Sequence, residues 1–105
     1  MAATLTHRSG EMTGLSTAAQ IEGLLSELDE PADQEHPDVA IADDTGLTLS
    51  AFTSGLVVME DVESGAEPVY LRNVPRAEAR HLFVLLARGE RLALAARDWQ
   101  PGYGA

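Results

Sequence analysis

The residues of this chain that could do chemistry are its three histidines, its seventeen carboxylates and its hydroxyl side chains. Nucleophilic catalysis by serine needs a hydroxyl on a strained turn, a histidine base and a carboxylate that orients the histidine. The sequence contains no Gly-x-Ser-x-Gly turn. His7 and His36 fall in segments without a regular pattern, and His81 is expected at a partly exposed helix position. We therefore predict no catalytic residue and expect that the protein is not an enzyme.

An acidic segment that runs from Asp29 to Asp38 holds the side chains that could ligate a metal ion. These are Asp33, Glu35, His36 and Asp38. A calcium loop needs a fixed spacing of carboxylates with a glycine at its turn, and this segment lacks both. Its two prolines and the absence of an apolar face predict an exposed, solvated loop. Since the chain also has no cysteine and no glycine-rich phosphate loop, we predict no metal site and no cofactor.

Two adjacent carboxylates, Asp43 and Asp44, open the sequence Asp-Asp-Thr-Gly, which is a strong turn signal. Paired carboxylates can act as a general acid and a general base. Adjacent residues in a turn point to different sides, however, and such aspartates typically accept hydrogen bonds from the turn backbone. We interpret this pair as turn-forming.

The charge of the chain is large and uneven. Among 105 residues, seventeen acidic against seven basic side chains give a net charge of −10. Residues 1–67 hold fourteen carboxylates and one arginine, whereas residues 68–105 hold three carboxylates and six arginines. This balance argues against nucleic acid as a partner and favours a basic protein surface, toward which the acidic half would be attracted. No stretch is long and apolar enough for a signal peptide or a membrane span, so we expect a cytoplasmic protein that does not bind membranes.

Hydrophobic patterning divides the chain into a polar lead-in and one folded unit. Residues 1–14 show no amphipathic face, which predicts a flexible N-terminal segment. Thr17 and Gln20 fit a capping box, and the apolar residues that follow at helical spacing predict a helix over residues 18–28. We expect a single α+β domain over residues 15–105.

Short apolar runs separated by turn residues predict an antiparallel meander in the rest of the chain. The predicted strands cover residues 39–42, 47–51, 56–59 and 69–71. Pro75 and Gly89 bracket a second helix. Residues 92–99 fit a helix by their alanines and a strand by their alternation, and we favour a fifth strand that ends with Trp99 closing the core and a tail that continues no element. The expected fold is an antiparallel meander sheet of four to five strands packed against two helices.

Five carboxylates fall in the predicted hairpin turns: Asp43, Asp44, Glu60, Asp61 and Glu63. The first and third turns of a meander lie at the same end of the sheet, so these side chains are expected to form one acidic rim. We predict that this rim binds the partner.

Residues spread along most of the chain carry a resemblance to a known family. They are the helix Ile21–Leu28, the turn and strand Gly46–Leu49, the strand start Gly55–Met59, and the run Val74–Ala79 followed by Phe83, Gly89 and Trp99. In order and spacing, over residues 17–100, they resemble the first-numbered Imm family of bacterial polymorphic-toxin immunity proteins, which are often encoded beside deaminase-type toxins. The family ending often has a proline soon after the glycine, whereas Glu90 follows Gly89 here, which leaves the register of the last strand open.

The resemblance implies an immunity protein that binds a cognate toxin and occludes its active-site cleft. A toxin that modifies nucleic acid needs a basic cleft for phosphates, and an acidic rim could fill that cleft. An alternative function is a small ligand-binding or accessory subunit of a larger enzyme, with Tyr70, Ser50 or His81 as the polar groups of a pocket. Edge strands of the meander could also pair across a two-fold axis, so a homodimer is a further possibility.

Overall fold

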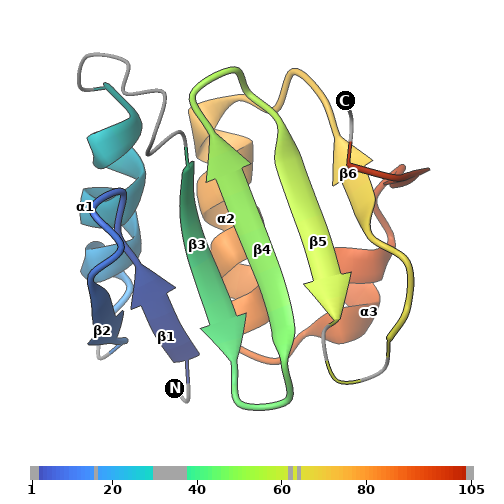
Figure 1. Cartoon of the computed structure of the whole chain (residues 1–105), viewed down its shortest axis with the longest axis horizontal. Coiled ribbons are helices and arrows are strands. Elements are labelled where there is room, and N and C mark those ends of the chain that lie inside the picture. The colour runs from blue at the N-terminus through green and yellow to red at the C-terminus, as the bar shows by residue number, and fades with distance from the viewer. Residues whose placement is uncertain (1–2, 16, 30–37, 62, 64, 104–105) are drawn as a thin grey trace.

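The structure is a computed structural model of the whole chain, and it describes residues 3–15, 17–29, 38–61, 63 and 65–103. Within these residues, seven strands and three α-helices are formed (Figure 1). The strands are β1 (Ala3–Thr6), β2 (Met12–Gly14), β3 (Asp38–Asp43), β4 (Leu47–Phe52), β5 (Val57–Asp61), β6 (Val69–Leu71) and β7 (Gln100–Pro101). The helices are α1 (Ala19–Ser26), which continues into a 3-10 turn (Glu27–Asp29), α2 (Arg76–Ala87) and α3 (Arg91–Ala95).

One antiparallel sheet in the order β2-β1-β3-β4-β5-β6-β7 contains every strand among the described residues. The helices lie behind this sheet in the view of Figure 1. The predicted α+β class is therefore confirmed, with more strands and one more helix than expected. None of the described helices is long and apolar enough to cross a membrane.

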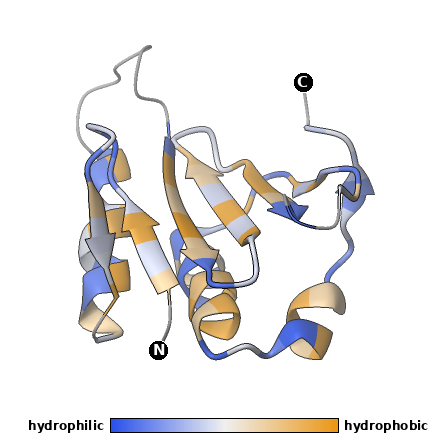
Figure 2. Cartoon of the chain, turned by 60° about the horizontal axis from the view of Figure 1, so that its bottom comes forward, coloured by the Kyte–Doolittle hydropathy of each residue, from blue (hydrophilic) through white to orange (hydrophobic). Residues whose placement is uncertain are grey.

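The core lies between the sheet and the helices. In β4 the burial alternates, so that Leu47, Leu49 and Ala51 are buried while the residues between them are half-buried. This alternation follows from the period of a strand, and Figure 2 shows hydrophobic and hydrophilic residues interleaved along the strands. Phe83 and Leu82 of α2 are fully buried against this side of the sheet.

Both predicted helices are present. Gln20 accepts a hydrogen bond from the Thr17 N–H at 2.8 Å, which is one half of the predicted capping box. Pro75 immediately precedes α2, and Gly89 follows it with a φ of +72°. Because glycine adopts this backbone conformation without a steric penalty, it ends the helix as expected.

The prediction that residues 1–14 contain no regular element is wrong for the described part of this segment. β1 and β2 form a hairpin, and β1 pairs with β3 in the register Leu5↔Ile41. Leu5 is 1% exposed. Its threonine neighbours on the strand face away from the core, so the segment looks polar although it supplies a core strand.

The prediction of a fifth strand over residues 92–99 is also wrong. Residues 91–95 form α3, which buries Leu94 and leaves Leu92 90% exposed. The indole N–H of Trp99 donates to the Leu94 carbonyl at 2.9 Å, and the ring packs against the core. The alanine-rich sequence prefers a helix, and the apparent alternation did not outweigh that preference. The chain then forms β7 beside β6, so the tail after Trp99 does continue into an element.

Candidate functional site

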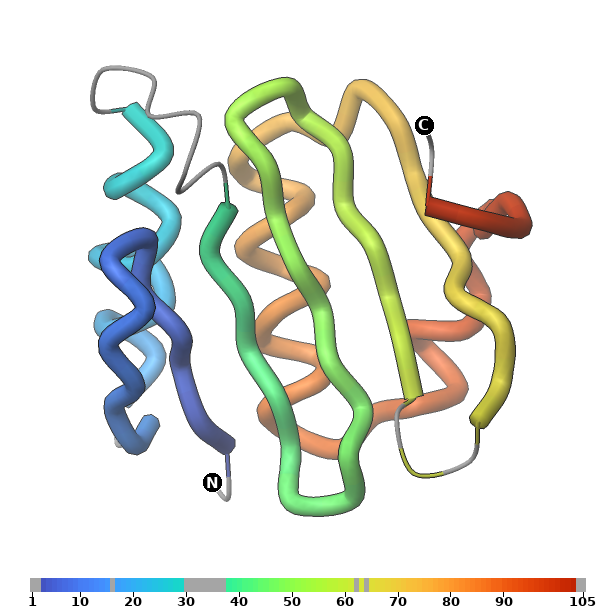
Figure 3. The backbone as a smooth tube through the Cα atoms, viewed as in Figure 1, coloured from blue at the N-terminus to red at the C-terminus, as the bar shows by residue number. Residues whose placement is uncertain are grey.

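The strand register brings the predicted acidic residues to one end of the sheet. The turn between β3 and β4 lies at this end, and β5 finishes beside it (Figure 3). Leu47, the first residue of β4, pairs with Asp61, and Thr48 pairs with Glu60. Asp43 is the last residue of β3, and Glu60 and Asp61 are the last residues of β5, so the prediction that these three lie in turns is wrong. We call Asp43, Asp44, Glu60, Asp61 and Glu63 the acidic end.

Asp43 shapes the turn from inside the acidic end. Its Oδ1 accepts hydrogen bonds from the Thr45 N–H at 2.9 Å, the Thr45 hydroxyl at 2.7 Å and the Leu47 N–H at 3.0 Å. Arg91 of α3 contacts both Asp43 and the Thr45 hydroxyl. The side chain of Asp43 is 12% exposed. Burial alone would raise its pKa, but the hydrogen bonds from Thr45 and Leu47 and the charge of Arg91 outweigh burial and lower the pKa.

Asp61 and Glu60 also have internal partners. Asp61 accepts a hydrogen bond from the Glu63 N–H at 3.2 Å, which orders the start of the next connection. Glu60 accepts a hydrogen bond from the Tyr103 hydroxyl at 3.2 Å. This bond and the charge of Glu60 raise the pKa of Tyr103. The phenol is thereby held as a neutral donor beside the carboxylate.

Asp44 and Glu63 are the exposed members of the acidic end. The five predicted residues are thus brought to one place, but they differ in role. Asp43 maintains the turn, Glu60 and Asp61 are half-buried, and Asp44 and Glu63 present their carboxylates to solvent. A partner approaching this end would meet the last two first.

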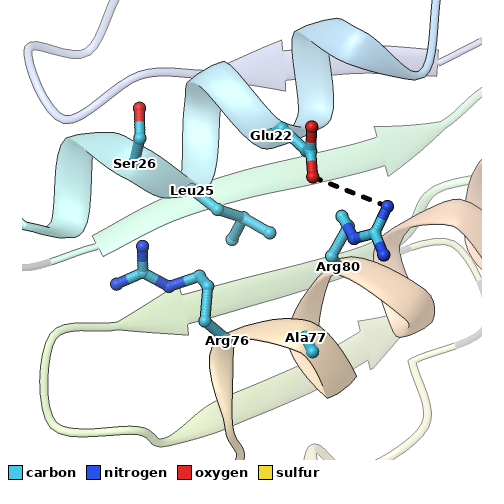
Figure 4. Close-up of a pocket in the computed structure, with 6 residues that line it drawn as sticks. All are labelled: Glu22, Leu25, Ser26, Arg76, Ala77 and Arg80. Carbon is cyan, nitrogen blue, oxygen red and sulfur yellow. Dashed lines mark ion pairs between the residues drawn. The ribbon is translucent and has the colours of Figure 1, made fainter.

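A groove between α1 and α2 is a candidate site for the small ligand of the alternative function (Figure 4). Its volume is about 430 Å³, and its lining includes Leu25, Arg76 and Arg80. Arg76 binds Asp29 in a bidentate pair at 2.9 and 3.1 Å, and Arg80 lies 3.5 Å from Glu22. These ion pairs cross between the two helices, so the arginines already serve to hold the helical layer together.

The pocket residues suggested by the sequence do not line that groove. Ser50 and Tyr70 belong to β4 and β6 of the sheet, and His81 is exposed on α2. The structure does not bring these three side chains together in the groove of Figure 4.

A polar cluster that the sequence did not reveal connects the β1–β2 hairpin to the end of α1. His7 lies 2.5 Å from Glu27 through Nδ1 and 2.9 Å from the Thr13 hydroxyl through Nε2. Arg8 donates from its backbone N–H to the Glu27 carboxylate and from its guanidinium to the Glu27 carbonyl. A hydroxyl, an imidazole and a carboxylate are the side chains of a catalytic triad. Here they connect the β1–β2 hairpin, which supplies His7 and Thr13, to the end of α1, which supplies Glu27, and no sequence signal brings Glu27 to that hairpin.

Among the described residues, no group of three or more histidines and carboxylates is placed to hold a metal ion. Of the segment considered for metal binding, Asp33, Glu35 and His36 lie outside the described residues. No family model, curated protein or solved structure matches the chain. The structure thus shows an α+β protein whose sheet carries five carboxylates at one end. The proposed function rests on these features.

Proposed function

We propose that this protein is a cytoplasmic immunity protein, without catalytic activity, that binds a cognate bacterial toxin and occludes its active-site cleft. The observation that carries the proposal is the convergence of the acidic end, which collects carboxylates from the end of β3 and its turn and from the end of β5 and the residues after it. A toxin that modifies nucleic acid, for example a deaminase, would present a basic cleft for the phosphates of its substrate. The family resemblance of the sequence supports the same partner.

The exposed pair Asp44 and Glu63 supplies the long-range part of this recognition. Together with the net charge of −10 it attracts a basic surface before contact is made. Such attraction raises the association rate more than it raises the affinity. Since salt screens exposed charges, the association rate should fall as ionic strength rises and the Debye length shortens from about 10 Å at 0.1 M to about 3 Å at 1 M.

The first test is biological. The C-terminal domain encoded by the neighbouring reading frame is expressed in a bacterial host, with and without this protein. We expect the domain to stop growth, and we expect co-expression of this protein to restore growth and to give a complex that co-purifies. A harmless neighbour, or killing that this protein does not relieve, would contradict the proposal.

The second test assigns the acidic end. The variant Asp44→Lys/Glu63→Lys should associate with the toxin about tenfold more slowly than the wild type in low salt. The matched control is Glu11→Lys/Asp98→Lys, which changes the net charge equally on exposed residues outside the acidic end. Equal rates for the two double variants would show that net charge alone, rather than the acidic end, directs association.

A further inference from the structure

The sheet has one face that the described helices do not cover. In Figure 1 this face is turned toward the viewer, with the helices behind it. The strand register aligns one row of residues across it: Met12, Thr6, Ala40, Ser50, Val58 and Tyr70. We call this side of the sheet the open face.

Val58 shows that the open face has apolar packing of its own. It is 3% exposed, yet it does not belong to the core between the sheet and the helices. Its cross-strand neighbours on the open face are Ser50 and Tyr70. The guanidinium of Arg72 lies 5.2 Å from the centre of the Tyr70 ring, which is within the range of a cation–π contact. Val58 is therefore a buried apolar residue on the side of the sheet that the helices do not cover, with Tyr70 as its cross-strand neighbour.

The middle of the open face is built from small side chains. Ala40 and Ser50 occupy the two central strands, so no long side chain there must be immobilised when a partner binds. Larger apolar groups stand at the borders, where Met12 is 66% exposed and Tyr103 is 55% exposed. Tyrosine and methionine are enriched in protein interfaces, and tyrosine is frequent among the residues that contribute most of the binding energy.

The charges on this side of the sheet select the partner. Glu60 pairs with Thr48 and Asp38 pairs with Phe52, which places both carboxylates on the open face. Asp44 and Glu63 of the acidic end add two exposed carboxylates at its border. A second copy of this chain would present the same carboxylates on this face and would itself carry a net charge of −10. The charge therefore favours a basic protein over a homodimer.

We propose that the open face is the docking surface for the basic partner protein, with the acidic end as one border of a larger interface. This inference rests on the proposed function, and it adds where the partner sits. Tyr103 is an anchor in this interface because its bond to Glu60 fixes the ring before binding. Tyr70 is a second anchor, because it lies beside Val58 in the register and its ring contacts the Arg72 guanidinium.

The test introduces one arginine at the centre of the open face and one on the opposite layer. Ser50→Arg places a long, charged side chain in the middle of the proposed interface. Ser26→Arg is the matched control, because Ser26 is an exposed serine on α1 and the change in charge is the same. Thermal unfolding checks that both variants fold, and calorimetry with the toxin domain measures the dissociation constant. We expect Ser50→Arg to raise the dissociation constant at least a hundredfold and Ser26→Arg to change it less than threefold.

Each outcome decides between the two proposals. If wild type binds the toxin domain and both arginine variants bind equally well, the open face is not the docking surface while the proposed function stands. If only Ser26→Arg weakens binding, the partner sits on the helical layer and the inference is wrong. If wild type does not bind the toxin domain at all, both proposals are overturned. Light scattering of the free protein that showed a dimer abolished by Ser50→Arg would assign the open face to a second copy instead.

Discussion

Leu49 and Ser50 are consecutive residues of β4, but they stand on opposite faces of one sheet. Leu49 is completely buried beneath the helices, whereas Ser50 is half-buried on the open face. The same contrast separates two carboxylates of β3. Asp43 points to the helical side, where donors surround it, and Asp38 lies on the open face. One face of this sheet thus holds the fold together, and the other is left available for contact.

The largest expected effect comes from the core face. Leu49→Ala should lower the free energy of unfolding by about 2–5 kcal/mol, because it removes buried methyl groups and leaves a cavity. Ser50→Ala, one residue along, should change it by less than about 0.5 kcal/mol. Urea denaturation of the two variants measures both values. Similar losses in the two variants would mean that the open face also contributes to folding stability.

The next largest effect concerns the turn between β3 and β4. Asp43→Ala should lower the free energy of unfolding by about 1–3 kcal/mol, because the backbone N–H groups of Thr45 and Leu47 lose their acceptor. Asp44→Ala is the neighbouring control and should stay within about 0.5 kcal/mol of wild type. A similar loss in both variants would show that charge near the turn, rather than the Asp43 hydrogen bonds, stabilises it.

Acid should remove the stabilisation that Asp43 provides. Its pKa is lowered in the folded state, so the folded protein binds this proton less readily than the unfolded chain does. The contribution is present above the unfolded pKa of about 3.9 and is lost as the pH falls through the lower, folded value. The difference in the free energy of unfolding between wild type and Asp43→Ala should therefore become smaller in acid. Denaturation curves at neutral and acidic pH measure this difference. A difference independent of pH would contradict this assignment.

Removing the charge of Asp38 should change the free energy of unfolding least, and it should raise stability where removing Asp43 lowers it. Burial raises its pKa, and a hydrogen bond with its own backbone N–H only partly offsets that rise. The folded protein therefore binds a proton at Asp38 more readily than the unfolded chain does. This binding stabilises the fold at a pH below the unfolded pKa, and the stabilisation is lost as the pH rises through the higher pKa of the folded state. At pH 7 Asp38→Asn should raise the free energy of unfolding by up to about 0.5 kcal/mol. The gain should vanish in acid, and a loss of stability at pH 7 would contradict the prediction.

The sequence predicted the elements whose signals are local. Pro75 and Gly89 mark the two ends of α2 because their own backbone conformations favour a helix start and a helix end. The Asp43–Gly46 turn is likewise determined by the backbone preferences of its own residues. β1 was missed because its place in the sheet depends on β3, and its pattern contains a single large apolar residue, Leu5. α3 was misread because five residues are too few for helical periodicity to exceed an apparent alternation.

The gathering of the five carboxylates at one end of the sheet was predictable, but their different structural roles were not. The first and third turns of a meander lie at the same end of the sheet. The acidic residues therefore come together there, and their side-chain contacts play no part in that placement. Which carboxylate is held by the fold depends on Arg91, which reaches Asp43 from α3. Since α3 itself was predicted as a strand, this partner could not be foreseen. The bond between Tyr103 and Glu60 likewise depends on β7, which brings the end of the chain back to the sheet.

The position of β1 between β2 and β3 has a consequence for the order of folding. β3, β4 and β5 pair with strands that follow them directly, whereas Thr4 pairs with Ala42 across the whole of α1. Closing that longer loop costs more chain entropy than closing a hairpin. β1 therefore cannot pair with the rest of the sheet until β3, which lies later in the chain, is available. In the folded protein β2 forms one border of the sheet, so its amide hydrogens should exchange with solvent earlier than those of the central strands.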